Sequence, residues 1–148
     1  MHNLTWSATS SAVGLDNTIE ESLSWLTGGY AAISREKVKS YFGPKMILIK
    51  AHIERKKQAR EAVSNLGFNL LTKLAESGDL AERIDEGNTL HLRLDLASLV
   101  CGRIQLMQDG GDGVVKGRFK LEVYPGQDPI LIARELLSNA AKKAKKNN

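Results

Sequence analysis

The sequence has a single cysteine among 148 residues, so it can form neither an intrachain disulfide nor a zinc site built from several cysteines. The neighbours of Cys101 are Leu99 and Val100, and this apolar setting predicts a small buried thiol. No apolar run approaches the length that spans a bilayer, and the first residues lack the basic segment of a signal peptide. A reduced, cytoplasmic protein without membrane contact is therefore expected.

Aromatic residues are scarce, at 5% of the chain. Sheets that read RNA by stacking bases place paired aromatic residues on their central strands. Here the alternation of apolar residues around Phe119 points that side chain inward. Base stacking is therefore not the expected mode of any nucleic-acid binding.

Catalytic and cofactor motifs are also scarce. The chain has three histidines, without an acidic or cysteine partner at metal-ligand spacing, and it has no serine nucleophile elbow. The glycine-rich segment 109–113 lacks the Lys-Ser/Thr pair of a phosphate-binding loop and is predicted to be a hairpin tip. Asp85, Glu86 and Asp95 leave one alternative open, a magnesium-dependent nuclease. The prediction is a protein without catalytic activity, cofactor or metal.

The composition indicates a folded protein of mildly basic character. Apolar residues make up 42% of the chain, the net charge is +4 and the isoelectric point is near 9.2. No internal repeat or linker is apparent, so residues 1–148 are expected to form one domain. The lysine-rich tail, residues 141–148, is expected to fray.

The hydrophobic periodicity predicts an α+β fold, with a single mixed or antiparallel sheet and helices packed on one face. Asn17 and Glu20 suggest a capping box at the start of the first helix, and Gly28-Gly29 ends it. Segment 96–101 is too short to assign. Strands are expected near 3–13, 31–41 (an edge), 45–53, 88–95, 104–106 and 115–123. Helices are expected near 17–26, from residue 55 to about 76 without interruption, and after Asp128-Pro129.

The start of the second predicted helix is unusual. Arg55, Lys56, Lys57 and Arg60 fall in its first turns, although the positive end of the helix dipole disfavours cations by about 0.3–1 kcal/mol each. A cluster placed against this rule tends to mark function, and a bound polyanion would turn the repulsion into attraction. The alternative is a solvated, charged helix end.

The strand alternation also predicts which side chains face away from the helices. Hydroxyls and cations dominate this open face, a composition that suits phosphate and ribose contacts and equally suits plain water. The outward residues are Thr5, Ser7, Lys50, His52, His91, Arg93, Lys116, Arg118 and Lys120.

Segment 84–95 carries a resemblance to a known family. Its acidic turn Asp85-Glu86-Gly87, its strand ending in Leu92-Arg93-Leu94-Asp95 and the later Gly102 resemble an archaeal family described as RNA-binding and linked with the exosome. Three further landmarks match the family in the same order: the turn at Gly43-Pro44, the basic start of the second predicted helix, and Tyr124-Pro125. Two positions depart from the family pattern: Leu96 replaces a basic residue, and Gly43-Pro44 lacks an intervening asparagine.

The resemblance implies a fold similar to that of ribosomal protein L-five and an RNA-binding function, with exosome or ribosome-associated proteins as further partners. Combined with the residue patterns, it predicts recognition of the backbone of structured RNA. The alternative is a protein–protein module or homodimer that uses the open face, where Met46 and Leu48 point outward. The predicted RNA-binding residues are Arg55, Lys56, Lys57, Arg60, Arg93, Lys116, Arg118 and Lys120.

Overall fold

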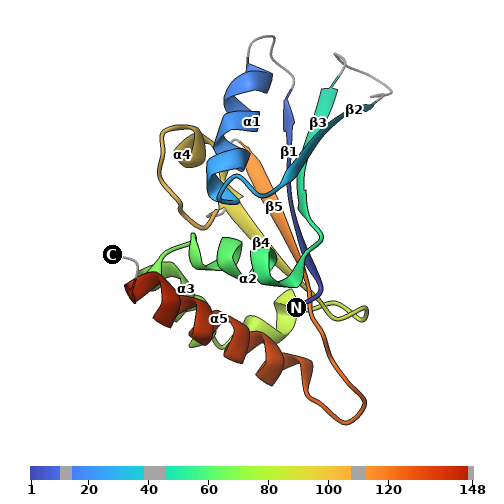
Figure 1. Ribbon diagram of the computed structural model, residues 1–148, viewed down its shortest axis with the longest axis vertical. Helices are drawn as coiled ribbons and strands as arrows, with labels where there is room; N and C mark the ends of the chain where they lie inside the picture. The colour runs from blue at the N-terminus through green and yellow to red at the C-terminus, as the bar shows by residue number, and fades with distance from the viewer. Residues whose placement is uncertain (11–14, 39–45, 108–112, 147–148) are drawn as a thin grey trace.

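The computed structural model of the protein describes residues 1–10, 15–38, 46–107 and 113–146. Its centre is a five-stranded antiparallel sheet in the order β2-β3-β1-β5-β4 (Figure 1). The strands are β1 (Asn3–Ser10), β2 (Ala32–Val38), β3 (Met46–Ile53), β4 (Thr89–Asp95) and β5 (Val114–Lys120). The helices are α1 (Leu15–Leu26), α2 (Lys56–Ser64), α3 (Phe68–Ala75), η1 (Leu80–Arg83), α4 (Leu96–Val100) and α5 (Pro129–Lys146).

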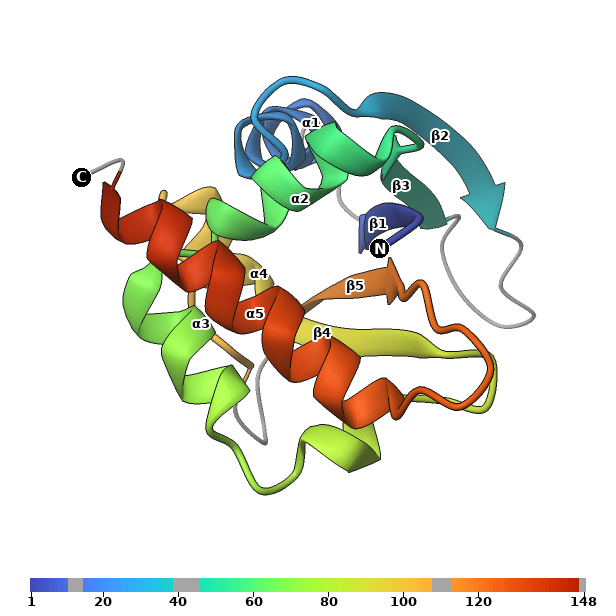
Figure 2. The same cartoon turned by 60° about the horizontal axis from the view of Figure 1, so that its bottom comes forward.

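The helices gather on one face of the sheet, as Figures 1 and 2 show. Helices α1 and α2 contact β1 and β3, and α5 packs against α2 and α3. The α+β fold class, with an antiparallel sheet and helices on one face, is therefore confirmed. The opposite face of the sheet is left open.

The core lies between the sheet and the helices because alternate strand residues are apolar. Trp6 on β1 and Phe119 on β5 are fully buried there, with ring centroids 5.5 Å apart in an edge-to-face arrangement. Gly117 lies opposite Trp6 in the register of β1 and β5. A Cβ atom at Gly117 would stand 2.5 Å from the indole ring, so only glycine leaves room for Trp6 there.

One helix predicted from the sequence is two separate helices in the structure. The expected uninterrupted helix from residue 55 to about 76 breaks into α2 and α3. The break occurs at Gly67, whose φ of 90° lies where side-chain-bearing residues are strained. Segment 104–106 is likewise not a strand of a hairpin with β5. Leu106 instead forms a single bridge to Leu94, at the edge of β4.

Two smaller predictions, the capping box and the buried Cys101, are also wrong. Helix α1 begins at Leu15, and Asn17 accepts a hydrogen bond from Arg35 of β2 in place of capping the helix. Helix α5 continues to Lys146 with Ala141 and Ala144 buried, and fraying of the tail 141–148 stays a prediction. Cys101 is exposed because it follows the last turn of α4. The predicted Gly43-Pro44 turn and the hairpin tip at 109–112 lie outside the described residues.

Candidate nucleic-acid interface

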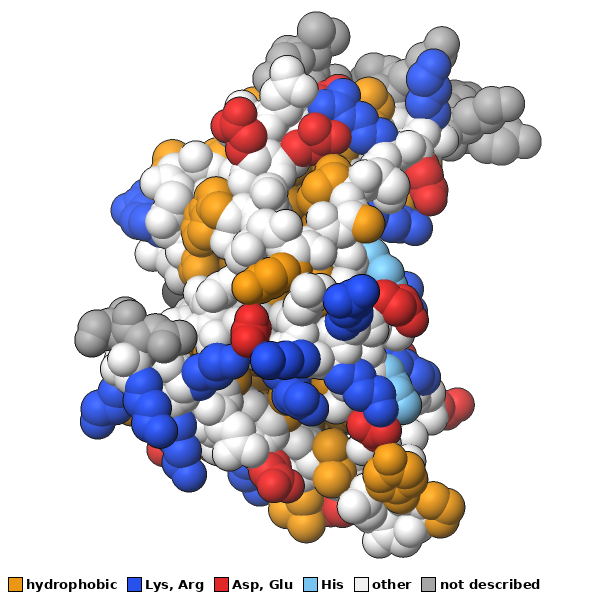
Figure 3. Space-filling view, in the orientation of Figure 1, with side chains coloured by type: hydrophobic (Ala, Val, Ile, Leu, Met, Phe, Trp, Pro, Cys, Tyr) orange, Lys and Arg blue, Asp and Glu red, His pale blue; other side chains and the backbone are white. Residues whose placement is uncertain are grey.

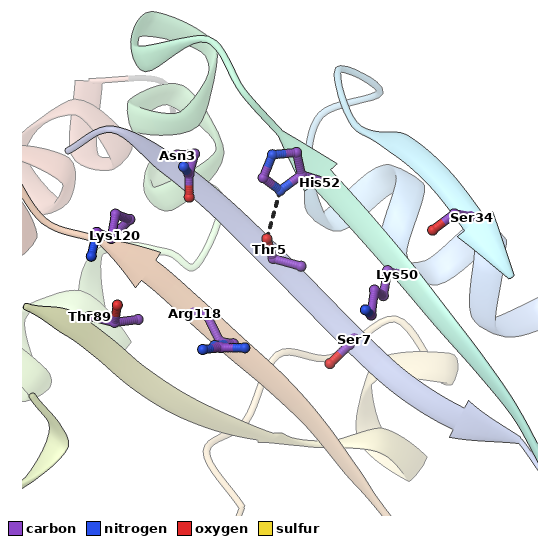
Figure 4. A pocket seen from close by; sticks show the side chains of 9 residues that line it. All are labelled: Asn3, Thr5, Ser7, Ser34, Lys50, His52, Thr89, Arg118 and Lys120. Carbon is purple, nitrogen blue, oxygen red and sulfur yellow. Dashed lines mark hydrogen bonds between the residues drawn. The ribbon is translucent and has the colours of Figure 1, made fainter. Parts of the chain in front are cut away.

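The open face of the sheet contains a shallow groove of about 440 Å³ that runs across all five strands. Figure 4 shows its side chains rising from the strands into the same space. The lining contains no acidic residue and no Phe, Tyr or Trp. The groove is lined by Asn3, Thr5, Ser7, Ser34, Lys50, His52, Thr89, Arg118 and Lys120.

Strand pairing arranges these side chains in columns. On β1, Thr5 lies between His52 of β3 and Arg118 of β5, because each is its partner in the register. One step along the strand, Ser7 lies between Lys50 and Lys116. A column of neutral polar side chains on β1 is thus flanked on both sides by a column of basic side chains.

Four predicted RNA-binding residues lie on this face. Arg118 and Lys120 line the groove, while Lys116 and Arg93 face each other one step further along β5 and β4. Lys50 and His52 of β3 belong to the groove but were not among the predicted binding residues, although the alternation had placed them outward. Asn3 and Ser34 were missed altogether, because only the strand order brings them to the groove.

Some of these cations have partners and some do not. Lys120 donates to the carbonyl of Gly87 at 2.6 Å, and Lys50 lies 3.6 Å from Glu36. Among the described residues, no hydrogen bond or ion pair engages the side chain of Arg118, Lys116 or Arg93. These three exposed cations are therefore available to a ligand.

His52 is held at the centre of a hydrogen-bonded chain. Its Nδ1 lies 2.7 Å from the Thr5 hydroxyl and its Nε2 lies 2.6 Å from the Glu54 carboxylate. Because a carboxylate only accepts, Nε2 carries a hydrogen, and in the neutral ring Nδ1 accepts the Thr5 hydroxyl hydrogen. These two hydrogen bonds fix the orientation of both Thr5 and His52 in the groove.

His91 at the far edge has a comparable partner. Its Nε2 lies 2.7 Å from Asp85, and the backbone amides of Gly87 and Thr89 also donate to that carboxylate. These hydrogen bonds, led by the one from His91, lower the pKa of Asp85. Asp85 is thus committed to shaping the turn before β4.

The carboxylates of the nuclease alternative do not converge. Asp85 precedes β4, whereas Asp95 at its other end caps α4 by accepting from the amide and hydroxyl of Ser98. No cluster of three or more His, Cys, Asp or Glu side chains able to hold a metal ion occurs among the described residues. The geometry required for that alternative is absent from this part of the chain.

The other four predicted residues form a separate group at the start of α2, called here the α2 cluster: Arg55, Lys56, Lys57 and Arg60. All four are exposed. Arg55 is the N-cap residue without a side-chain capping bond, and no acid lies in the first turn. The helix thus begins against the dipole rule, as predicted.

The α2 cluster lies on the helix side of the molecule, and Figure 3 shows lysine and arginine side chains gathered over α2 and α5. Lys56 donates to Glu122 at 2.8 Å. This bond and one from the Tyr124 hydroxyl lower the pKa of Glu122 to about 2. One of the four cations is therefore neutralised by the protein itself, while Arg55, Lys57 and Arg60 have no ion pair among the described residues.

Comparison with known proteins places this geometry in a family. Residues 9–121 match the model of a family described as RNA binding. The chain belongs to this family. The match runs from the last two residues of β1 to the end of β5, so it includes the whole α2 cluster and the groove residues of β2, β3, β4 and β5, but not Asn3, Thr5 and Ser7. Sequence comparison finds no match among curated proteins.

Solved structures agree with this assignment. A DUF54 protein from Archaeglobus fulgidus is 25% identical, with a TM-score of 0.74, over 91% of this chain and 98% of that one. A DUF54 protein from Methanothermobacter thermautotrophicus is 22% identical, with a TM-score of 0.67, over 97% and 96%. One from Sulfolobus solfataricus is 18% identical, with a TM-score of 0.63. The latter two show that the fold is shared.

The described residues give no sign of a membrane-spanning segment. Helix α5 is the longest at 18 residues, and its lysines and polar residues make it too hydrophilic to cross a bilayer.

Proposed function

We propose that this protein binds the sugar–phosphate backbone of folded RNA through the open face of its sheet. The observation that carries the proposal is the groove in which Lys50, Arg118 and Lys120 stand together without a lining acid. Cations gathered in one concave surface attract phosphates, and the release of counterions from RNA drives such binding. The RNA-binding description of the family points in the same direction.

The groove lining contains no Phe, Tyr or Trp, and its one aromatic ring, the imidazole of His52, is hydrogen-bonded at both nitrogens. Proteins that read single-stranded bases stack them on aromatic side chains. Here the buried Trp6 and Phe119 face the helices, so the groove is lined by hydroxyls, an amide, one imidazole and cations. These groups match phosphate and ribose oxygens better than they match the faces of bases.

Charge reversal at two unpaired positions tests the proposal. The Arg118→Glu/Lys116→Glu variant removes two exposed cations that have no described partner, so the fold should be retained. Each lost phosphate contact lowers the slope of log affinity against log salt by about one, so the slope should fall by about two. Titration of a fluorescent RNA hairpin across a salt series measures it.

A matched control separates a local effect from net charge. Lys73→Glu/Arg103→Glu makes the same change in charge at exposed residues outside the groove and the α2 cluster. The control should keep the wild-type slope. Equal slopes for the two variants, or no RNA binding by the wild-type protein at low salt, would refute the proposal.

The resemblance also supports a finer proposal, that the bound RNA is presented to the archaeal exosome or to ribosome-associated proteins. This association rests on the family resemblance and not on a surface of this molecule. Co-elution of the purified protein with a purified archaeal exosome core in gel filtration, with and without RNA, would test it. Separate elution in both cases would remove the exosome from the proposal.

A further inference from the structure

The order of the columns on the open face indicates which part of an RNA lies in the groove. The neutral column on β1 consists of Asn3, Thr5 and Ser7. The basic columns consist of Lys50 and His52 on β3, and of Lys116, Arg118 and Lys120 on β5. Neighbouring strands are about 4.8 Å apart, so the two basic columns are separated by roughly twice that distance.

This order corresponds to one surface of an RNA duplex. The minor groove of A-form RNA is wide and shallow and displays ribose 2′-hydroxyls, with a phosphate strand beyond each edge. A protein face with hydroxyls and an amide in the middle and cations on both sides complements that sequence of groups. A single RNA strand would leave one basic column without phosphates.

The neutral column retains hydrogen-bonding capacity for a ligand. No described hydrogen bond engages the side chains of Asn3 or Ser7, so both can donate and accept. Thr5 differs, because its hydroxyl hydrogen is directed to Nδ1 of His52 whenever that ring is neutral. Its oxygen therefore faces the groove as an acceptor, and a ribose 2′-hydroxyl is a donor that suits it.

From this arrangement we infer that the open face binds the minor groove of double-stranded RNA, and that the β1 column recognises ribose 2′-hydroxyls. This inference rests on the proposed function and adds its substrate class, A-form duplex, and the feature that distinguishes RNA from DNA. The flanking columns hold the two phosphate strands. Recognition of this kind is independent of base sequence.

Modified duplexes test the inference with the wild-type protein. The probes are blunt duplexes of one sequence made of RNA, of DNA, of 2′-O-methyl RNA and of 2′-fluoro RNA. The two modified RNAs keep the A-form but remove the hydroxyl donor, so they separate shape from hydroxyl recognition. The RNA duplex should bind more tightly than each of the other three, by roughly two- to tenfold for each hydrogen bond lost.

Two variants should separate the 2′-hydroxyl preference, assigned to the β1 column, from the salt dependence, assigned to the basic columns. Ser7→Ala should reduce the preference for RNA over 2′-fluoro RNA while leaving the salt slope unchanged. Arg118→Gln should lower the salt slope by about one while keeping that preference. Ser138→Ala on α5, which lies outside the groove, is the control for removal of a hydroxyl and should change neither quantity.

The outcomes distinguish this inference from the function on which it rests. Equal affinity for RNA and for both modified duplexes, or tighter binding of single strands than of duplexes, would overturn the minor-groove inference while leaving RNA binding in place. Absence of binding to every RNA probe would overturn both. If Ser7→Ala loses the preference for RNA over 2′-fluoro RNA and Ser138→Ala keeps it, the β1 column is the source of that preference.

Discussion

At the scale of single residues, the contact between Lys56 and Glu122 offsets one of the cations at the start of α2. Lys56 donates to Glu122 at 2.8 Å and Tyr124 donates to the same oxygen at 2.9 Å. The pair joins the first turn of α2 to the segment that follows β5. A cation at a helix N-terminus, unfavourable by itself, is in this way offset by an acid from elsewhere in the chain.

This contact predicts a defined pH dependence of stability. The pKa of Glu122 falls from 4.5 to about 2 on folding. A carboxyl group with a lowered pKa stabilises the fold above its unfolded pKa, and the contribution is lost as the pH falls through the folded pKa. Wild type should therefore lose stability between about pH 4.5 and 2, and Glu122→Gln should lose less in that window.

Urea denaturation of both proteins from neutral to acidic pH measures the difference. Glu122→Gln should be the less stable protein at neutral pH, and the two should converge near the acidic limit of the window. Glu135→Gln on α5 is a control, because no partner of this exposed glutamate is described. A constant difference between wild type and Glu122→Gln at every pH would contradict the assignment.

Residue-level predictions from the sequence succeed where periodicity decides them. The alternation identified Arg93, Lys116, Arg118 and Lys120 as outward, because a strand with one buried face allows a single phase. It could not place Asn3 beside Lys120, since that contact depends on β1 pairing with β5 across more than a hundred residues. Cys101 was misplaced because apolar neighbours in sequence do not determine where a short helix ends.

At the scale of secondary-structure elements, the break between α2 and α3 shows a limit of the same method. Apolar residues continue at spacings of three and four through Gly67, and Leu66 and Leu74 are both buried. The sequence therefore predicts one continuous helix that this glycine destabilises by about 1 kcal/mol relative to alanine. Its φ of 90° and ψ of 153° instead end one helix and begin the next.

Replacing Gly67 by alanine should therefore destabilise the protein. Space is not the reason, because a Cβ atom there would meet nothing within 4 Å. The cost is the backbone conformation, which is nearly exclusive to glycine and strained for other residues by about 1–3 kcal/mol. If the chain formed one continuous helix, alanine would instead stabilise it by about 1 kcal/mol. The sign of the change thus decides between the two structures.

Chemical denaturation gives that sign. Gly78→Ala is the matched control, since it adds the same methyl group in open space at a residue without a positive φ. The control should be neutral or slightly stabilising because alanine reduces the freedom of the unfolded chain. A Gly67→Ala protein as stable as this control would contradict the strained break.

At the scale of the whole molecule, basic groups lie on two surfaces that meet at one end of the sheet. Strand β3 ends at Ile53, opposite Leu4 near the start of β1, and the chain then turns through Arg55 into α2. Asn3 and Lys120, paired in the register, mark the same end of the groove. The α2 cluster therefore begins where the groove ends, around the edge of the sheet.

The two explanations of the α2 cluster, a phosphate-binding site and a solvated helix end, predict different RNA binding when its cations are removed. In the triple variant Arg55→Ala/Lys57→Ala/Arg60→Ala, Lys56 and its bond to Glu122 remain. Removing cations from a helix N-terminus relieves an unfavourable interaction of about 0.3–1 kcal/mol each, so the triple variant should be more stable than wild type under either explanation. RNA binding separates the two. A phosphate-binding cluster predicts a salt slope lower by up to about three, whereas a solvated helix end predicts an unchanged slope.

Combining this variant with Arg118→Glu/Lys116→Glu shows whether one RNA touches both surfaces. If it does, the reductions in slope should add, because the sites are separate and share no described contact. If the groove alone binds RNA, the combined variant should have the slope of the groove variant. If the triple variant gains stability and keeps the wild-type salt slope, the α2 cluster is a solvated helix end and takes no part in RNA binding.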